Sequence, residues 1–475
     1  MKSFRLLSIL AAVGFSTAGG FAAVEYEVVD LGTLGGGASA ALGINDRGQA
    51  VGWSQDADGR IQAFRWQNGS MAGLGFLPGG TGSVAHAVNN SGDITGQAHV
   101  SETNVHAFLH ASNNLVDLGT LGGFNSWGRG INNHGDVIGS SQLASNVPTI
   151  WDPETFVWRS NTFIHVPPYG GNAYSCDGYG ICDEGRISGI TFLYSPNPRW
   201  WAYVWYDANG NFSNEWTEMK LLGSLAPKNS GGEYSCALDI NNAGQAVGWT
   251  GVTNTFSPQH AFLVTSSNGV WKVPDSSVNP TNLLMQDLGT LDGFSNNSFA
   301  NSINDRTWIV GTSTTGSGTN QAFLWRDGAM TNLNLLLPPG SDWVLTNATC
   351  INEYNEIVGS GLHAGQPRAF LLRQGGRIAA VTPVFQTNTW VYTNELDEVV
   401  TQSEAHVETQ VLHWAGVWGT NVEAARVFTV ESCDALNTGN WAPFAPTSQW
   451  PITDSIWTNN DFGSASMRFF RVRAQ

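Results

Sequence analysis

Charged residues are scarce in this sequence of 475 residues, in which Asp, Glu, Lys and Arg together make up 12%. Basic residues are the scarcer kind, so the formal net charge is −17. An acidic surface is repelled by phosphate backbones, which argues against nucleic acid as a partner. Long apolar runs are also lacking beyond the first residues, so no transmembrane segment is expected there.

Cysteine is nearly absent, with five in the chain and no CxxC pair, which argues against a zinc site. No GxSxG motif, P-loop or sialidase-type box occurs. Candidate carboxylate pairs lie only in turn-like segments, Glu353 with Glu356 and Glu395 with Asp397 and Glu398. Both groups are interpreted as exposed acidic turns. We therefore assign no catalytic, cofactor-binding or metal-binding residue, and we expect no cofactor.

Residues 1–22 have the features of a signal peptide. A short basic segment precedes the apolar stretch from Leu6 to Phe15, and Gly20 and Ala22 fit the −3 and −1 positions of a cleavage site. The apolar stretch is too short to span a bilayer. Cleavage after Ala18, or retention as an N-terminal membrane anchor, is the alternative. We expect an exported protein, extracellular, on the cell surface or in the periplasm.

Three short units recur in a fixed order along the chain. DLGTLGG occurs at Asp30–Gly36 and Asp117–Gly123, and DLGTLDG at Asp287–Gly293. The second unit reads Ile-Asn, turn residues, Gly, apolar residues and Gly, and an aromatic-rich third unit follows each copy. The glycines that close the second unit lie 43 to 63 residues apart, at Gly52, Gly96, Gly139, Gly189, Gly248, Gly311 and Gly359.

Seven repeats of this length predict a seven-bladed β-propeller with four strands in each blade, over residues 23–380. Asn or Asp would open the turn in each second unit, and Gly would take its left-handed position. The chain begins with a fourth-strand unit at Tyr26–Leu31, whereas the seventh repeat ends with a third-strand unit at Arg368–Leu372. We predict that the N-terminal strand completes the last blade and closes the ring. An open β-solenoid is the competing architecture.

These motifs resemble the HAF family of bacterial extracellular repeat proteins, named for the His-Ala-Phe seen at His106–Phe108 and His260–Phe262. The resemblance covers Tyr26 to Leu372, and the fourth and seventh copies depart most from the pattern. It implies an exported bacterial protein without an established enzymatic activity. His106 is interpreted as a structural histidine bonded to the backbone.

Residues 381–475 predict a second, small β-sandwich-like domain. Its well-marked strands are expected at Thr389–Tyr392, Val407–Trp414, Ala425–Glu431 and Met467–Val472. The stretch Phe428–Trp441 and the terminal MRFFRVRA resemble a short C-terminal β-domain of exported bacterial proteins.

The loops after the second and fourth strands of a propeller blade share one face, and we expect the variation in length to lie there. The longest second-to-third connections are predicted at Ser140–Thr155 and Ile190–Trp200. Aromatic side chains near these loops are predicted to bind a ligand, namely Trp127, Tyr174, Tyr179, Tyr194, Trp200, Trp201 and Tyr234. Packing between blades is the alternative for most of them.

Cys176 and Cys236 each end a Tyr-Ser-Cys triplet in consecutive repeats, which suggests a disulfide between adjacent blades. Pairing of Cys176 with Cys182 is the alternative.

Together these features favour an exported, monomeric, non-catalytic binding or scaffold protein whose partner is an unknown protein or a glycan. The alternative is a hydrolase or lyase that acts on polysaccharide at the propeller mouth. Two or more carboxylates within about 10 Å of each other at the mouth would favour the enzyme.

Overall fold

The computed structural model describes residues 26–374 except for 145–152, 170–174, 194–198, 208–217, 228–232, 267–283 and 294–295, and beyond 376 it describes the strands named below. The chain divides into two units, Glu27–Arg373 and a second unit formed by Met1–Tyr26 with Gln374–Gln475. The predicted signal peptide, residues 1–22, lies outside the described residues. Within the described part of the chain, no helix is long and apolar enough to cross a membrane.

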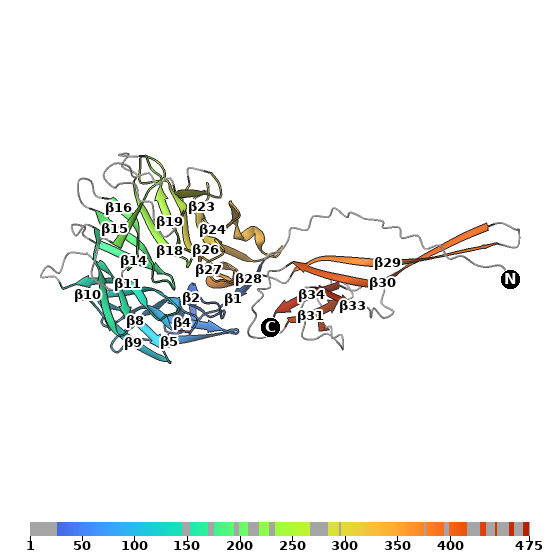
Figure 1. Ribbon diagram of the computed structural model, residues 1–475. Helices are drawn as coiled ribbons and strands as arrows, with labels where there is room; N and C mark the ends of the chain where they lie inside the picture. The colour runs from blue at the N-terminus through green and yellow to red at the C-terminus, as the bar shows by residue number, and fades with distance from the viewer. Residues whose placement is uncertain are drawn as a thin grey trace. The chain divides into compact units, whose positions relative to one another are not determined.

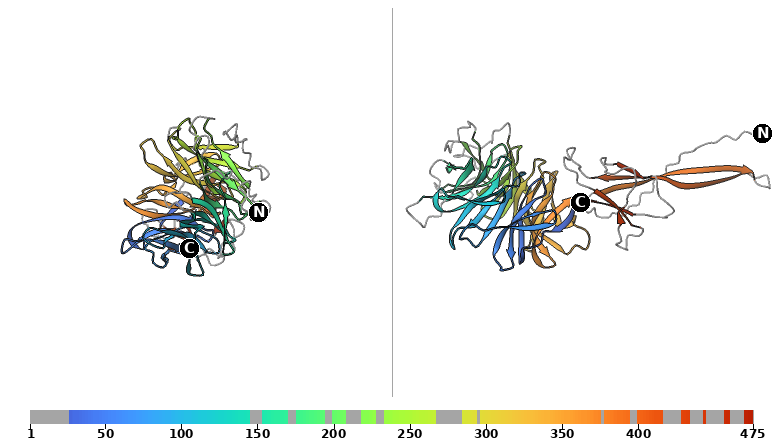
Figure 2. Two further views of the ribbon diagram at one scale, coloured as in Figure 1. Left: turned by 90° about the vertical axis from the view of Figure 1, so that its left-hand side faces the viewer. Right: turned by 90° about the horizontal axis from the view of Figure 1, so that it is seen from below.

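The larger unit is a seven-bladed β-propeller, as predicted, and its four-stranded antiparallel blades follow one another around an axis (Figure 1, Figure 2). The first three blades are β2 (Gly35–Ile44), β3 (Ala50–Asp56), β4 (Ile61–Gln67) and β5 (Ser70–Gly75); β6 (Ser83–Val88), β7 (Ile94–His99), β8 (Val105–Ala111) and β9 (Asn114–Gly119); and β10 (Gly122–Ile131), β11 (Val137–Leu143), β12 (Pro153–Arg159) and β13 (Thr162–Val166).

The remaining blades follow the same plan. Blade 4 is β14 (Ser175–Ile181), β15 (Ile187–Leu193), β16 (Arg199–Trp205) and β17 (Met219–Gly223), and blade 5 is β18 (Ser235–Ile240), β19 (Gln245–Gly251), β20 (Gln259–Thr265) and β21 (Met285–Gly289). Blade 6 is β22 (Ser298–Ile303), β23 (Ile309–Thr314), β24 (Asn320–Arg326) and β25 (Ala329–Asn332), followed by the 3₁₀ helix η3 (Leu333–Leu336). Blade 7 holds β26 (Trp343–Ile351), β27 (Ile357–His363) and β28 (Gln366–Gln374).

The fourth strand of blade 7 comes from the other end of the propeller. β1 (Tyr26–Asp30) pairs with β28 in the order β1-β28-β27-β26, and the Leu31 N–H donates to the Ala369 carbonyl at 3.1 Å. Beside this seam the Thr349 hydroxyl donates to the Ala41 carbonyl at 2.8 Å, which joins blade 7 to blade 1. The predicted closure of the ring by the N-terminal strand is therefore confirmed, and an open solenoid is excluded.

The two faces of the propeller differ in their connections. Because the strands of a blade are antiparallel, the first-to-second and third-to-fourth connections emerge on one face, which we call the turn face. The second-to-third connections and the links to the next blade emerge on the other, which we call the loop face. The expectation that length varies on the loop face alone is wrong, since the longest connections, 206–218 and 266–284, join third to fourth strands on the turn face.

A row of three residues across each blade explains the repeated glycine and aromatic residue. In blade 2 Ala85 pairs with Gly96, and Gly96 pairs with Phe108. A Cβ atom on Gly96 would lie 2.0 Å from the Val84 carbonyl oxygen and 2.9 Å from the Phe108 ring. The glycine thus lets a fully buried aromatic ring lie across the second strand. Each of the other blades has the same pairing at its Gly and Phe or Tyr.

A serine at the start of the inner strand ties most blades to the preceding one. The Ser83 hydroxyl accepts from the Ala63 N–H at 2.9 Å and donates to the Gly75 carbonyl at 2.7 Å. In blade 4 Cys176 replaces this serine, and its thiol accepts from the Thr155 N–H and donates to the Val166 carbonyl, both at 3.4 Å.

The suggested disulfide between Cys176 and Cys236 is not formed, because both are free thiols. In blade 5 it is Ser235 that makes the serine contacts, accepting from the Ala202 N–H at 2.9 Å. Cys236 is therefore one residue out of register with Cys176 and points to the opposite side of its strand. The alternative partner, Cys182, is a free thiol as well.

The DLG unit and the histidine of His-Ala-Phe interact through side chains. Asp117 accepts from the Gly119 N–H at 2.7 Å, and His106 Nδ1 lies 2.9 Å from its carboxylate. Asp287 and His260 repeat this arrangement in blade 5. His106 is thus structural, as expected, but its partner is a carboxylate and not the backbone.

The C-terminal unit contains two antiparallel three-stranded sheets. The first has the order β29-β30-β33, with β29 (Arg377–Thr393), β30 (Val399–Ala415) and β33 (Ile456–Asn459). The second has the order β32-β31-β34, with β32 (Ala442–Pro443), β31 (Phe428–Cys433) and β34 (Phe469–Ala474). The four predicted strands all overlap strands of the structure. A β-sandwich arrangement of these sheets stays a prediction.

We predict that the Gly96→Ala variant is destabilised by at least about 2 kcal/mol, because its new methyl group would overlap the Val84 carbonyl oxygen. Chemical denaturation of the full chain measures the change. Gly316→Ala is the matched control, since no atom lies within 4 Å of a Cβ built on Gly316. A Gly96→Ala protein as stable as the control would contradict the packing described for the three-residue row.

We also predict that Leu31→Ala lowers the free energy of unfolding by about 2–5 kcal/mol, because Leu31 is buried in the seam between blade 7 and blade 1. Val116→Ala, which truncates an exposed side chain on β9, should change it by less than about 0.5 kcal/mol. Equal effects of the two substitutions would show that the seam contributes little to stability.

Candidate functional site

The turn after each inner strand is built around the Asn of the Ile-Asn unit. In blade 1 the Asn45 side-chain oxygen accepts from the N–H groups of Arg47 and Gln49, both at 3.0 Å. The Gly48 N–H closes the turn on the Asn45 carbonyl at 3.1 Å, and Gly48 has φ +70°. This Asx turn leaves the Asn45 amide nitrogen free to reach the neighbouring blade.

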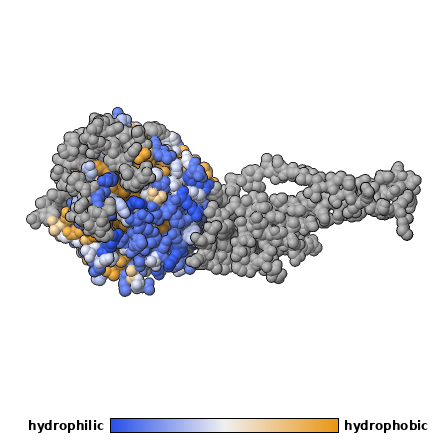
Figure 3. All heavy atoms as spheres, in the orientation of Figure 1, coloured by the Kyte–Doolittle hydropathy of each residue, from blue (hydrophilic) through white to orange (hydrophobic). Residues whose placement is uncertain are grey.

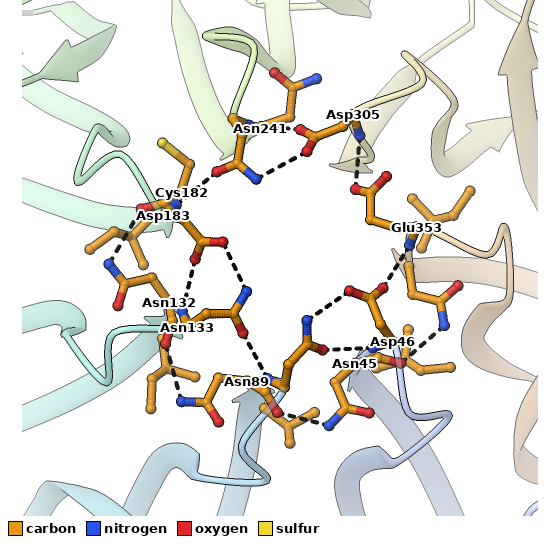
Figure 4. Close-up of a pocket in the computed structure, with 18 of the residues that line it drawn as sticks. Asn45, Asp46, Asn89, Asn132, Asn133, Cys182, Asp183, Asn241, Asp305 and Glu353 are labelled. Carbon is orange, nitrogen blue, oxygen red and sulfur yellow. Dashed lines mark hydrogen bonds between the residues drawn. The ribbon is translucent and has the colours of Figure 1, made fainter. Parts of the chain in front are cut away.

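These amide nitrogens form an inner ring around the axis on the turn face (Figure 4). Each donates to the carbonyl of the equivalent residue in the next blade. The six bonds run from Asn45 to Asn89 (2.8 Å), Asn89 to Asn132 (3.1 Å), Asn132 to Cys182 (3.4 Å), Asn241 to Asn304 (2.9 Å), Asn304 to Asn352 (3.1 Å) and Asn352 to Asn45 (3.0 Å). Blade 4 carries Cys182 at this position, which has no amide to donate.

The next residue of every turn forms a second, outer ring. In each blade its backbone N–H donates to the side-chain oxygen of the equivalent residue in the next blade. The seven bonds are 2.8 or 2.9 Å long and link Asp46, Asn90, Asn133, Asp183, Asn242, Asp305 and Glu353 in a closed circle. Asn, Asp and Glu all supply the acceptor oxygen that this bond needs, which explains why they alternate at one position.

The two rings surround a cavity of about 430 Å³ on the axis. Its wall is polar and its floor is aliphatic, because the residue before each ring asparagine also faces the cavity. The floor residues are Ile44, Val88, Ile131, Ile181, Ile240, Ile303 and Ile351. This volume lies in the range of small-molecule sites.

Carboxylates are not spread evenly around the outer ring. Asp305, Glu353 and Asp46 follow one another, since Asp305 N–H donates to Glu353 and Glu353 N–H donates to Asp46. Burial, together with the charges of Asp305 and Asp46, raises the pKa of Glu353 to about 7. The interpretation of Glu353 and Glu356 as an exposed turn is wrong for Glu356, which is buried and accepts from the Asn352 amide at 2.8 Å.

Carboxylates therefore do meet at a mouth of the propeller, which was the stated criterion for a hydrolase. Their oxygens are largely occupied, however, by the turn-to-turn bonds. Asp46, for example, accepts from the Glu353 N–H at 2.9 Å and from the Asn90 amide at 2.8 Å. Positions with Asn in place of Asp make the same N–H bond, so the ring is explained by its structural role without acid–base chemistry.

The aromatic residues predicted to bind a ligand differ in their burial and in their place in the propeller. Trp127 and Trp201 are buried within the propeller. Tyr179 lies half-buried on the inner strand β14, 5.8 Å below the guanidinium of Arg129. Trp200 and Tyr234 lie at the loop face, whereas Tyr174 and Tyr194 are outside the described residues.

A second candidate surface lies on the loop face of blades 4 to 6. Phe256, in the second-to-third connection of blade 5, is 53% exposed and meets Tyr234 edge to face at 5.1 Å. Trp249 contacts Phe256 and also Phe299 of blade 6, both at 6.4 Å. Trp200 is 45% exposed and packs on Phe192 at 6.3 Å. Phe256, Trp249 and Phe299 were missed by sequence reasoning, which did not weigh the blade 5 loop.

Exposed apolar side chains are concentrated on this face. Most of the described surface visible in Figure 3 is hydrophilic, with apolar residues in separate small patches. Of the nine exposed large hydrophobic residues in the described part, six lie at the loop-face ends of strands or in loop-face connections: Phe124, Trp200, Phe256, Leu335, Val344 and Leu362. Tyr206 and Tyr354 lie on the turn face and Val116 on β9.

Among the described residues, no three His, Cys, Asp or Glu side chains are placed so that they could hold a metal ion. Burial, with the nearby charge of Arg129, lowers the pKa of His86 to about 3, so its imidazole is neutral at physiological pH.

No protein-family model matches the chain, and no curated protein matches it. Several solved structures align with the chain at low similarity. The β-propeller domain of the trilobed protease from Pyrococcus furiosus aligns with a TM-score of 0.42 and 11% identity, over 71% of this chain and 95% of that one. A gluconolactonase from Xanthomonas campestris gives 0.33 and 11%, over 74% and 95%. TolB from Acinetobacter baumannii gives 0.35 and 10%, over 73% and 66%. Similarity at this level supports no inference about function.

We predict that stability falls as the pH rises from about 4.5 to 7, because the pKa of Glu353 is about 7 in the folded protein and near 4.5 when unfolded. The folded state holds this proton in that window while the unfolded state releases it. Glu353→Gln removes the charge and keeps an acceptor for the Asp305 N–H. It should raise the melting temperature at pH 8 and change it little at pH 4.5.

Asp183→Asn is the control for this measurement, since it neutralises a carboxylate on the opposite arc of the same ring. The difference in melting temperature between pH 4.5 and pH 8 should shrink in Glu353→Gln and persist in Asp183→Asn. The same pH dependence in wild type and Glu353→Gln would refute the assignment to Glu353.

Proposed function

We propose that this chain is an exported, non-catalytic binding protein that uses the loop face of its propeller to hold a protein or glycan partner. The observation that carries the proposal is the concentration of exposed apolar side chains on that face. Exposed aromatic side chains that pack against neighbouring rings, as Trp200 and Phe256 do, are common anchors for protein and glycan partners. The signal-like N-terminus and the similarity of the repeats to the HAF family support export, which is part of the proposal.

The chemistry of the loop face suits either partner class. Exposed aromatic rings such as Trp200 and Phe256 supply flat apolar surfaces on which a sugar ring or a partner side chain can pack. Next to these rings, the Asn297 side-chain oxygen accepts from the Gln259 N–H at 2.9 Å, and Arg199 pairs with the buried Glu233. These polar contacts hold the loops that carry the rings in place, which lowers the entropy lost when a partner binds.

A polysaccharide hydrolase or lyase has less support. The carboxylates that meet at the turn-face mouth serve as acceptors for backbone N–H groups of neighbouring turns. Within the described residues of the loop face, Glu233 is buried in an ion pair with Arg199. The proposed function is therefore binding without turnover.

The test is binding of the purified protein to a glycan array and to a display library of bacterial exported proteins. For a ligand found in this way, we predict that Trp200→Ala with Phe256→Ala weakens binding at least tenfold, which corresponds to about 1.4 kcal/mol. Both side chains are about half exposed, so their removal should leave the fold intact.

Tyr206→Ala with Tyr354→Ala is the matched control, because these residues are 41% and 43% exposed on the turn face. If binding is lost in the control and kept in the loop-face variant, the partner binds the turn face and the proposal is contradicted. Release of products from a polysaccharide panel by the wild-type protein would show that the protein is an enzyme.

A further inference from the structure

The inner strand of every blade carries the same irregularity. In β10 the register with β11 skips Arg129, which lies unpaired between Gly128 and Gly130 and forms a β-bulge. A bulge turns a side chain away from the regular alternation of its strand and is common beside binding sites. We call the bulged residues of the seven inner strands the bulge ring, which consists of Leu42, His86, Arg129, Tyr179, Leu238, Asn301 and Thr349.

The bulge ring faces the axis of the propeller. Each of its residues is partly exposed, whereas the residue before it in the strand is buried. An inner strand is covered by a neighbouring blade on each side and by the second strand on its outer edge. The surface that the ring exposes therefore faces the central channel. The ring lies deeper than the turn-face cavity, because Arg129 precedes the cavity residue Ile131 by two positions.

Two polar bulge residues have a structural role. The Asn301 amide donates to the Ala348 carbonyl at 2.8 Å, and the Thr349 hydroxyl donates to the Ala41 carbonyl at 2.8 Å. Each bond joins a blade to the one that follows it. The bulge residues of blades 2 to 4 are polar as well, but within the described part of the chain they make no such bond. Their side chains need a different explanation.

Arg129 is a cation on the axis without a counter-ion among the described residues. Its Nε atom is buried and has no hydrogen-bond partner, and its ring contact is with Tyr179, whose centroid lies 5.8 Å from the guanidinium carbon. The two terminal nitrogens also lack a protein acceptor, and they are not among the buried atoms, so they face the channel. A partly buried cation is costly unless an anion or another acceptor meets it.

The neighbours of Arg129 define the charge of a matching ligand. Burial, and then the charge of Arg129, lowers the pKa of His86 to about 3, so this neighbour is neutral. Burial raises the pKa of Asp177, and the charge of Arg129 opposes that rise, but the two side chains form no ion pair. One cation beside one carboxylate matches a single negative charge and not a double one. The planar fork of a guanidinium fits the two oxygens of a carboxylate.

We propose that the central channel binds a small monocarboxylate anion at the bulge ring. The two oxygens of the ligand accept from the terminal N–H groups of Arg129. The Tyr179 hydroxyl, which makes no hydrogen bond within the described residues, is the next donor along the arc. The site lies inside the propeller and not on its loop face, so this proposal and the proposed function stand or fall separately.

The experiment is isothermal titration of the full-length protein with sodium acetate at pH 7, with chloride exchanged for acetate at constant ionic strength. Constant ionic strength separates binding at a site from general screening of charge. We expect saturable binding of one equivalent. Sodium sulfate is titrated in the same way and should bind more weakly, because the second negative charge meets no second cation.

Arg129→Gln should weaken acetate binding at least about tenfold. Arg47→Gln is the matched control, since it makes the same change in net charge at an exposed turn and should leave binding unchanged. Asp177→Asn should tighten binding, because it removes a like charge beside the ligand.

Thermal unfolding of each variant verifies its fold. If Arg129→Gln does not fold, Arg129→Lys replaces it, which keeps the charge, loses the fork and should also weaken binding. No saturable binding to wild type, equal binding by the Arg129 variant, tighter binding of sulfate than of acetate, or weaker binding by Asp177→Asn would each overturn the proposal.

Discussion

In six of the seven blades, the side-chain amide of one asparagine in the first turn does two things at once. Its oxygen closes the turn in its own blade, and its nitrogen donates to a carbonyl in the next blade. Local structure and the spacing between blades are therefore set by the same group. This contact is made by six of the seven turns, and at blade 4, where Cys182 replaces the asparagine, the Asp183 N–H bond to Asn242 links the turn to the next blade.

Farther from the axis, packing takes over from hydrogen bonding. The row of a small residue, a glycine and an aromatic residue lets the ring of Phe108 and its equivalents lie flat across a strand. The serine contacts, such as those of Ser83, then bond each inner strand to the third and fourth strands of the blade before it. The three kinds of contact act at different radii, so irregular loops can be inserted between them without disturbing the blades.

Much of the fold was predictable because the same three units recur in the same order in seven copies. The blade count, the order of units and the closure by β1 followed from the spacing and phase of motifs. The face chosen for long connections was wrong, because the connections 206–218 and 266–284 follow the aromatic unit and their position in a blade was not weighed. The predicted disulfide between Cys176 and Cys236 is wrong because the two cysteines differ by one position in the register of their strands. The Tyr-Ser-Cys triplet that they share does not reveal this difference.

The candidate sites were less accessible from sequence. The residue after each ring asparagine is Asp, Asn or Glu in every repeat, and this was the available signal for the outer ring. The sequence pattern indicates turn chemistry alone, because the residue that Glu353 contacts in the next blade, Asp46, is 307 positions away in the sequence. Trp127 and Trp201 are buried, whereas Trp200 is exposed. The sequence could not distinguish them, because tryptophan occurs both in cores and on surfaces.

The seam between β1 and β28 has a consequence for the order in which the molecule forms. Contacts beside it, such as the one between Ser39 of blade 1 and Ala369 of blade 7, join residues 330 positions apart in the sequence. Each blade from the first to the sixth pairs strands that are consecutive in the sequence, whereas β1 has no partner until β28 exists. Loop-closure entropy makes such distant pairing late and slow. Until that pairing forms, β28 keeps an unpaired edge, so the last blade depends on the strand with which the propeller begins.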